Sequence, residues 1–178
     1  MKDFLKIFKW SPILMVKWPA YTFLSCVAVL LSWILAPFLA AYSVVKRVDV
    51  LPGVLQYFST IDDTLDGGQH QVGYKTGVKG FVLWWQRTCW IFRNPAHGWQ
   101  SVYLGYKDER ATVLWSRVDQ TTKVWMHAAA DQKRYFTYKR DIPLFGDWYL
   151  KLWIGWSDRS YDGKYRHLLF QPFIPKKR

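Results

Sequence analysis

The chain has 178 residues, a formal net charge of +12 and a mean hydropathy of −0.12. The hydropathy excludes a protein built mostly of membrane spans, and the charge indicates an anionic partner such as lipid headgroups or nucleic acid, unless the surface is simply basic. Twelve tryptophans favour a dense small core, a membrane interface or both. The two cysteines, Cys26 and Cys89, exclude a disulfide scaffold and a thiolate zinc site.

Residues 1–20 form a basic segment with an amphipathic pattern. If residues 2–10 are helical, three lysines share one face, and apolar side chains fill much of the remainder. Such a segment suits the headgroup plane of a membrane. Together with the flanks of the following segment, it predicts a set of membrane-interface residues: Lys2, Lys6, Lys9, Trp10, Lys17, Trp18, Tyr21, Tyr42, Lys46 and Arg47.

Residues 21–45, YTFLSCVAVLLSWILAPFLAAYSVV, contain no charged residue and are long enough to cross a bilayer. A soluble core helix should carry a polar stripe, and here only hydroxyl residues interrupt the apolar ones. A secretion signal should have a shorter apolar core and a small residue where Leu39 stands. The run is therefore predicted to be a membrane anchor.

The topology of this anchor has two forms. As a single span, the excess of lysines before the run places the N-terminus in the cytoplasm and the following domain outside. If Pro37 breaks the run, a re-entrant hairpin keeps both basic flanks and the domain in the cytoplasm. The charge counts leave both forms open.

Residues 46–80 are predicted to be a juxtamembrane loop rich in glycine and acidic residues, with one short helix. Residues 81–93, FVLWWQRTCWIFR, have the spacing of a helix. From about residue 111 the pattern changes to period two, in runs separated by residues typical of turns, of which Ser160 to Gly163 is the clearest hairpin signal. Residues 81–178 therefore predict an α+β domain with four or five antiparallel strands, covered by the tryptophan-rich helix.

Catalytic chemistry has one candidate loop and one weaker pair. Asp62, Asp63, Asp66 and His70 could hold a divalent cation and serve a hydrolase, although their spacing fails the calcium-loop template and also fits a solvated turn. Cys89 with His97 or His127 could form a nucleophile and base, but a cysteine in such a run is usually a buried small side chain. We predict no cofactor and no enzymatic activity.

Basic residues alternate with aromatic ones in the strands, which suits single-stranded nucleic acid or anionic lipid. With an anchor in the same chain, the lipid interpretation is favoured. The residues concerned are Lys107, Arg110, Lys123, Lys133, Arg134, Lys139, Arg140, Lys151, Arg159, Lys164 and Arg166.

Several short motifs resemble those of a family of uncharacterised proteins encoded by tailed bacteriophages of Gram-negative hosts. They are the hydrophobic N-terminal segment, LPGVLQYFSTIDDTLDGG (51–68), RNPAHGW (93–99), LKLWIGWS (150–157) and LLFQPF (168–173). The resemblance implies a phage product at the host envelope and brings no catalytic residues. The shared-motif candidates are Leu51, Pro52, Asp63, Leu65, Asp66, Gly67, Arg93, Asn94, Pro95, Gly98, Gly155 and Trp156.

The sequence thus predicts a phage-encoded membrane protein that acts by binding at the host envelope. Host-envelope modification, including exclusion of competing phage, is one expected role, and an accessory part of the virion or its ejection machinery is another. Anionic lipid and a protein of the envelope or virion are the expected partners. A metal-dependent hydrolase and a nucleic-acid-binding sheet are the alternatives.

Overall fold

The computed structural model describes residues 2–61, 63–66, 73–107, 112–128, 133–158 and 164–177. The chain folds into two compact units. Unit 1 combines Met1–Thr22 with Leu104–Arg178, and unit 2 is Phe23–Tyr103. These limits differ from the predicted boundaries after residues 20, 45 and 80, because the N-terminal residues pack with strands that are distant in sequence.

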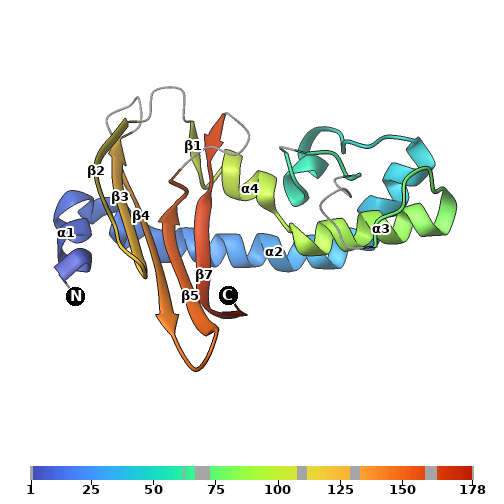
Figure 1. Cartoon of the computed structure of the whole chain (residues 1–178). Coiled ribbons are helices and arrows are strands. Elements are labelled where there is room, and N and C mark those ends of the chain that lie inside the picture. The colour runs from blue at the N-terminus through green and yellow to red at the C-terminus, as the bar shows by residue number, and fades with distance from the viewer. Residues whose placement is uncertain are drawn as a thin grey trace. The chain divides into compact units, whose positions relative to one another are not determined.

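The described helices are α1 (Lys2–Trp10), α2 (Pro12–Lys46), the 3₁₀ helix η1 (Gly53–Phe58), α3 (Gly80–Arg93) and α4 (His97–Val102) (Figure 1). Pro12 occupies the first position of α2, where a missing N–H costs no helical hydrogen bond. The helix then continues through Pro37 to Lys46 without a turn. Residues 21–45 therefore lie within one continuous helix, and the chain makes no hairpin at Pro37.

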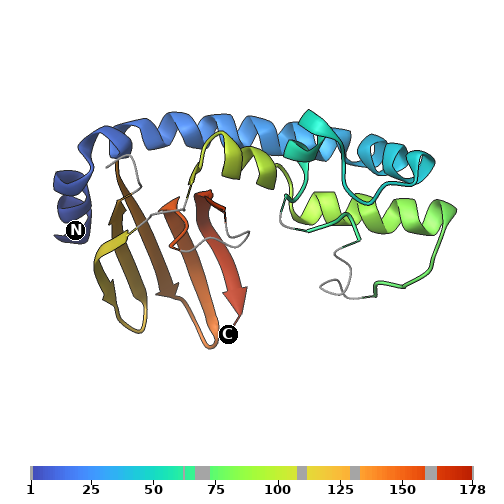
Figure 2. The same cartoon turned by 90° about the horizontal axis from the view of Figure 1, so that it is seen from above.

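The strands are β1 (Tyr106–Lys107), β2 (Thr112–Val118), β3 (Thr122–Ala128), β4 (Arg134–Pro143), β5 (Trp148–Trp156), β6 (Tyr165–Arg166) and β7 (Leu168–Lys177). Five of them form an antiparallel sheet in the order β2-β3-β4-β5-β7, seen side by side in Figure 2, and β1 pairs with β6. The predicted α+β class and five-stranded meander are confirmed. The predicted hairpin signal, Ser160–Gly163, lies outside the described residues.

Both faces of the sheet carry buried residues, and one face has an apolar row that crosses four strands. Val124, Tyr138, Ile154 and Phe170 are direct neighbours across four strands. Alternation along each strand places the intervening residues on the opposite face. This period is the physical reason why the strands could be located from the sequence alone.

The N-terminal helices supply contacts with this sheet. The indole N–H of Trp10 donates to the Tyr135 carbonyl at 3.1 Å, and that of Trp18 donates to the Leu169 carbonyl at 3.3 Å. Lys6 Nζ lies 3.4 Å from the ring centroid of Trp115. The tryptophan-rich helix expected at residues 81–93 is present as α3 in unit 2, where it packs with α2.

A buried hydrogen-bond chain joins β1, β3, β4 and β5 at His127, whose side chain is fully buried. The Thr137 hydroxyl donates to the Trp156 carbonyl at 2.5 Å, so it accepts from His127 Nε2, 3.1 Å away. Nδ1 is then the acceptor for the Tyr106 hydroxyl. Burial, reinforced by Arg166 and opposed by Asp158, lowers the pKa of His127 to about 3.

This pKa makes the stability of the protein dependent on pH. In the unfolded chain His127 takes up a proton at its ordinary pKa, near 6.5, whereas the folded protein resists protonation down to about 3. The contribution of His127 to the free energy of unfolding is therefore fully present above pH 6.5. It decreases as the pH drops towards 3, by up to about 1.4 kcal/mol per pH unit. We expect urea unfolding of the full chain to show this slope and a His127→Gln variant to lack it. An equal slope in both would contradict the assignment.

Candidate functional site

Helix α2 in unit 2 buries mainly small and hydroxyl residues, together with Leu39, and exposes most of its large apolar residues. Ser25, Ser32 and Ser43 are at most 2% exposed, as are Ala36 and Ala40. The opposite face exposes the large side chains, namely Phe23, Leu24, Val27, Leu30, Leu31, Ile34, Phe38 and Val45. A soluble amphipathic helix has the reverse arrangement, whereas a membrane helix places small residues at helix contacts.

Helix α3 also exposes large apolar side chains. Arg87, Thr88, Trp90 and Ile91 are buried, while Phe81, Val82, Trp85 and Phe92 are exposed. Unit 2 therefore exposes large apolar side chains on both helices, a feature that can mark an interaction site.

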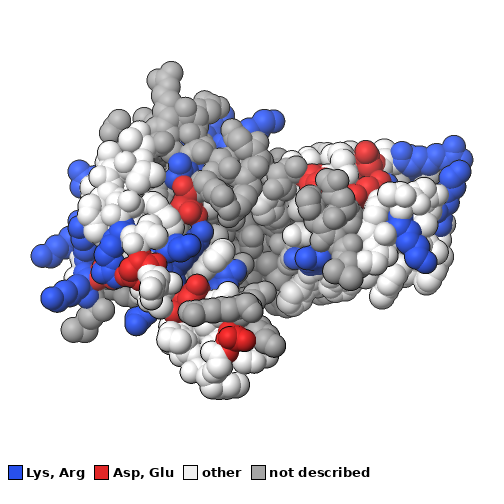
Figure 3. Space-filling model, in the orientation of Figure 1, with Lys and Arg blue, Asp and Glu red and all other residues white. Residues whose placement is uncertain are grey.

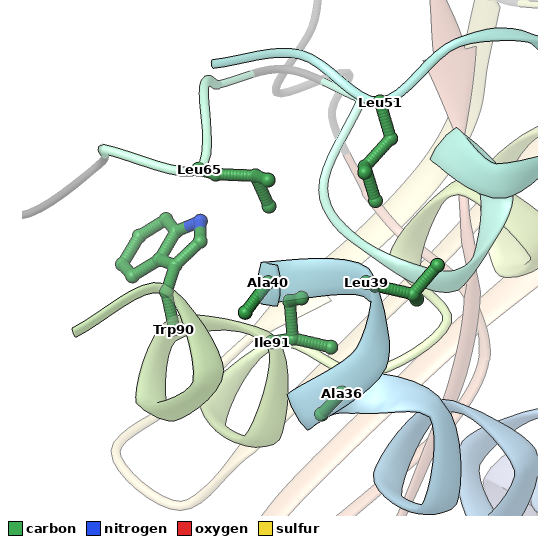
Figure 4. Packing of buried hydrophobic residues seen from close by; sticks show 7 residues of the cluster. All are labelled: Ala36, Leu39, Ala40, Leu51, Leu65, Trp90 and Ile91. Carbon is green, nitrogen blue, oxygen red and sulfur yellow. The ribbon is translucent and has the colours of Figure 1, made fainter. Parts of the chain in front are cut away.

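The two helices pack antiparallel through small residues and indole hydrogen bonds. In Figure 4, Ala36 and Ala40 of α2 face Ile91 of α3, and Leu51 and Leu65 close the cluster from the loop. The indole N–H of Trp33 donates to the Phe92 carbonyl at 3.2 Å, and that of Trp84 donates to the Pro37 carbonyl at 2.8 Å. The Phe92 carbonyl belongs to the last turn of α3, where no intrahelical donor follows.

Arg87 ties the acidic loop to the end of α2. Its Nε and Nη2 donate to the two carboxylate oxygens of Asp66 at 2.8 and 2.6 Å. Its Nη1 donates to Ser43 Oγ at 3.0 Å and to the Val48 carbonyl at 2.6 Å. The guanidinium is 6% exposed and lies at a helix C-terminus, where positive charge is favourable. Asp66, a predicted metal ligand, is thus the partner of a buried arginine.

The two central motifs of the resemblance meet in unit 2. The backbone N–H groups of Ala96 and Gly98 donate to the carbonyls of Phe58 and Ser59 at 3.3 and 2.9 Å. A Cβ on Gly98 would lie 2.8 Å from the Cα of Tyr57, so only glycine fits there. The motifs LPGVLQYFSTIDDTLDGG and RNPAHGW therefore pack on each other and shape this unit.

Other motif candidates have local structural contacts. Pro52 precedes η1, the Asp63 carboxylate accepts from the Thr64 N–H at 2.8 Å, and the Asn94 side chain donates to the Trp90 carbonyl at 3.2 Å. Leu51 and Leu65 are buried in the cluster of Figure 4. Arg93 ends α3 and Pro95 follows it, while Gly67 lies outside the described residues.

The motif LKLWIGWS (150–157) forms part of the sheet, in β5 and just after it. Gly155 has φ +94°, and a Cβ there would lie 2.2 Å from the Phe136 carbonyl oxygen, which excludes any other residue without rearrangement. Trp156 is fully buried and its indole N–H donates to the Leu104 carbonyl at 2.8 Å.

The predicted interface residues fall into two groups. Lys6, Trp10, Trp18 and Tyr21 contact residues of the sheet, Tyr21 by an edge-to-face contact with Trp156. The others have exposed side chains on α1, on α2 or just after α2, and they are Lys2, Lys9, Lys17, Tyr42, Lys46 and Arg47. A membrane-interface role for either group stays a prediction.

The metal-site hypothesis gains no support from the described residues. Among them, no three His, Cys, Asp or Glu side chains could hold a metal ion together. Asp62 and His70 lie outside the described residues. Cys89 and His97 are in unit 2 and His127 is in unit 1, where both of its ring nitrogens are hydrogen-bonded.

Positive charge is concentrated in unit 1. Of the 25 Lys and Arg residues of the chain 19 belong to unit 1, as do 9 of its 13 Asp and Glu residues. Figure 3 shows lysines and arginines over this unit with carboxylates interspersed. Arg110 and Arg159, which belong to the basic set predicted for anionic lipid or nucleic acid, lie outside the described residues. Lys107, Lys133, Arg134, Arg140, Lys164 and Arg166 lie on strands or at their ends.

By length and composition, α2 is the one described helix that could cross a membrane. Its most apolar window has a mean hydropathy of 2.3. The same measure also fits a signal sequence or a soluble core helix. The inward stripe of small and hydroxyl residues is the feature that sequence reasoning missed, although its spacing is visible in Ser25, Ser32 and Ser43.

The chain matches a family of unknown function, DUF7338, over residues 9–178, and it belongs to this family. The matched region includes all of α2, all of unit 2 and unit 1 from residue 9 onward. Searches of curated proteins and of solved structures found no match.

We expect Arg87→Leu to destabilise unit 2 strongly, because it leaves Asp66 without its partner and removes two bonds at the end of α2. Breaking such a buried pair costs about 3–5 kcal/mol, less here because the Asp66 side chain is 31% exposed. Urea unfolding in detergent should show Arg87→Leu/Asp66→Leu to be more stable than Arg87→Leu. If the double variant were the less stable, the two side chains would not act as a pair.

Proposed function

We propose that this protein is a membrane-anchored binding protein, held in the bilayer by α2 with α3 packed against it. The observation that carries the proposal is the inverted polarity of α2, which buries Ser25, Ser32 and Ser43 and exposes Phe23, Ile34 and Phe38. In water such a helix would expose its most apolar side chains and hide its polar ones. In hydrocarbon, apolar side chains on the outside of the helix and small hydroxyl residues at the helix contact are both favourable.

The dimensions of the two helices agree with this role. Residues 23–46 of α2 extend about 36 Å at 1.5 Å per residue, enough for a hydrocarbon core of about 30 Å. The 14 residues of α3 extend only about 21 Å. We therefore assign the crossing to α2 and treat α3 as a shorter companion within one part of the bilayer.

Several polar groups of unit 2 have the partners that a low-dielectric environment favours, although Ser32 Oγ is buried without a hydrogen-bond partner. The Phe92 carbonyl accepts from Trp33, and Ser25 Oγ accepts from the Gln100 side chain at 2.8 Å. Arg87 is paired with Asp66 at the end of α2 rather than midway along it. Unpaired groups at these positions would each cost several kcal/mol in hydrocarbon.

The basic unit 1 would carry the binding function. Its charge suits anionic lipid headgroups, and the motif resemblance suggests the envelope of a phage-infected Gram-negative cell, with the inner membrane as the site of anchoring. Modification of the host envelope, including exclusion of competing phage, is one role within this proposal, and an accessory role in the virion or in ejection is another. Binding rather than catalysis is favoured because Asp66 and His127 are both engaged in internal contacts.

The anchor is tested by placing two lysines on the outward face of α2, in Leu30→Lys/Ile34→Lys. Both side chains are at least half exposed, so the change should be harmless or beneficial in a soluble protein. In a bilayer, two mid-helix lysines cost roughly 5–7 kcal/mol on the insertion scale. We expect the unchanged protein to remain in bacterial membranes after an alkaline wash and the double variant to be largely lost from them.

Phe145→Lys is the matched control, because Phe145 is 73% exposed in the turn between β4 and β5. It should be retained like the unchanged protein. Release of the unchanged protein by the wash, or equal retention of the double variant, would overturn the anchor.

A further inference from the structure

Unit 1 contains a pocket on the face of the sheet opposite the apolar row of Val124, Tyr138, Ile154 and Phe170. The pocket has a volume of about 320 Å³, and six of its lining residues carry the argument: Lys123, Trp125, Lys139, Asp141, Trp153 and Asp158. Lys123, Lys139 and Trp153 are direct neighbours on β3, β4 and β5. Their neighbours in sequence, Val124, Tyr138 and Ile154, point to the opposite face and are buried.

Two lysines face each other directly across β3 and β4 in this pocket. Like charges in this position destabilise a sheet. Lys139 is only 8% exposed, and its Nζ lies 2.5 Å from an Asp158 carboxylate oxygen. An ammonium group has three donors, and this bond uses one of them. A bound anion between Lys123 and Lys139 would relieve their repulsion.

The indole rings supply a flat apolar wall beside these charges. Trp125 and Trp153 are both half-buried, and Lys139 Nζ lies 4.3 Å from the Trp153 ring centroid and 5.6 Å from that of Trp125. Lys151 Nζ lies 3.4 Å from the same centroid. The apolar C–H face of a sugar ring packs well on an indole, and the carboxylates of Asp141 and Asp158 are acceptors suited to hydroxyl donors.

We propose that this pocket binds an anionic saccharide, meaning a sugar ring that bears a phosphate or a carboxylate group. Lysines 123 and 139 bind the anion, Trp125 packs on the ring, and the two carboxylates accept hydrogen bonds from its hydroxyl groups. Nucleic acid fits less well. A strand needs a continuous cationic track and open ring faces for stacking, whereas two carboxylates line this pocket and ammonium groups lie over Trp153. The proposal does not depend on whether the chain enters a membrane.

The test is calorimetric titration of the full chain in a zwitterionic detergent that contains no sugar. The probes are glucose 6-phosphate, glucuronate, glucose, inorganic phosphate and an oligodeoxythymidylate. We expect at least one of the two anionic sugars to bind. Binding of glucose 6-phosphate would identify phosphate as the anion, and binding of glucuronate would identify carboxylate. Glucose lacks the anionic group and its charge-assisted hydrogen bonds, so its affinity should be lower than that of the anionic sugar by roughly 10- to 100-fold. Equal binding of glucose or inorganic phosphate, tighter binding of the oligonucleotide, or no binding by either anionic sugar would overturn the proposal.

Matched variants locate the binding. Lys123→Gln alters an exposed lysine of the pocket and should lower the affinity for the anionic sugar by roughly 10-fold or more. Lys107→Gln alters an exposed lysine on β1 and should leave that affinity unchanged. Trp125→Ala should also weaken binding, with Trp148→Ala as its control outside the pocket. Equal losses in pocket and control variants, or none in either pocket variant, would show that the sugar binds elsewhere.

Discussion

The packing of unit 2 depends on the small and hydroxyl face of α2. Because Ala36, Ala40 and Ser43 have short side chains, Trp90, Ile91 and the Arg87 guanidinium can lie directly against the helix. A larger residue at any of these positions would separate α2 from α3 and from the loop that closes over them. The same arrangement leaves most of the large apolar side chains of α2 in unit 2 on its outside, with Leu39 as the buried exception, so one pattern of residues underlies both the packing and the proposed membrane contact.

Hydrogen bonds then fix the relative positions of α2, α3 and the acidic loop more closely than apolar contacts alone would. Arg87 joins α3 to the acidic loop and to the end of α2, and Trp33 and Trp84 each join the two helices through a backbone carbonyl. In unit 1 the bond chain through His127 has the same role between strands. These groups explain why residues that resemble catalytic candidates in the sequence serve the fold here.

Local patterns predicted local structure well, and long-range contacts were beyond them. Strands β2 to β5 and β7 follow from alternation and turn residues, and α3 follows from spacings of three and four. The contact of Trp10 with Tyr135 joins residues 125 positions apart and leaves no periodic signal, so the packing of the N-terminal helices on the sheet was not predicted. The pairing of Asp66 with Arg87 is equally invisible in sequence. The two-lysine pocket needed the register of β3 against β4.

Cysteine labelling tests most directly whether the outward face of α2 meets lipid. In a background of Cys26→Ala/Cys89→Ala, Ile34→Cys and Val118→Cys would be compared in opened membranes with a water-soluble maleimide. The two native side chains are similarly exposed, at 65% and 59%. The account predicts that the thiol at position 118 reacts and the thiol at position 34 does so only after detergent is added, because maleimide reacts with hydrated thiolate. Equal reaction at both positions before detergent would contradict it.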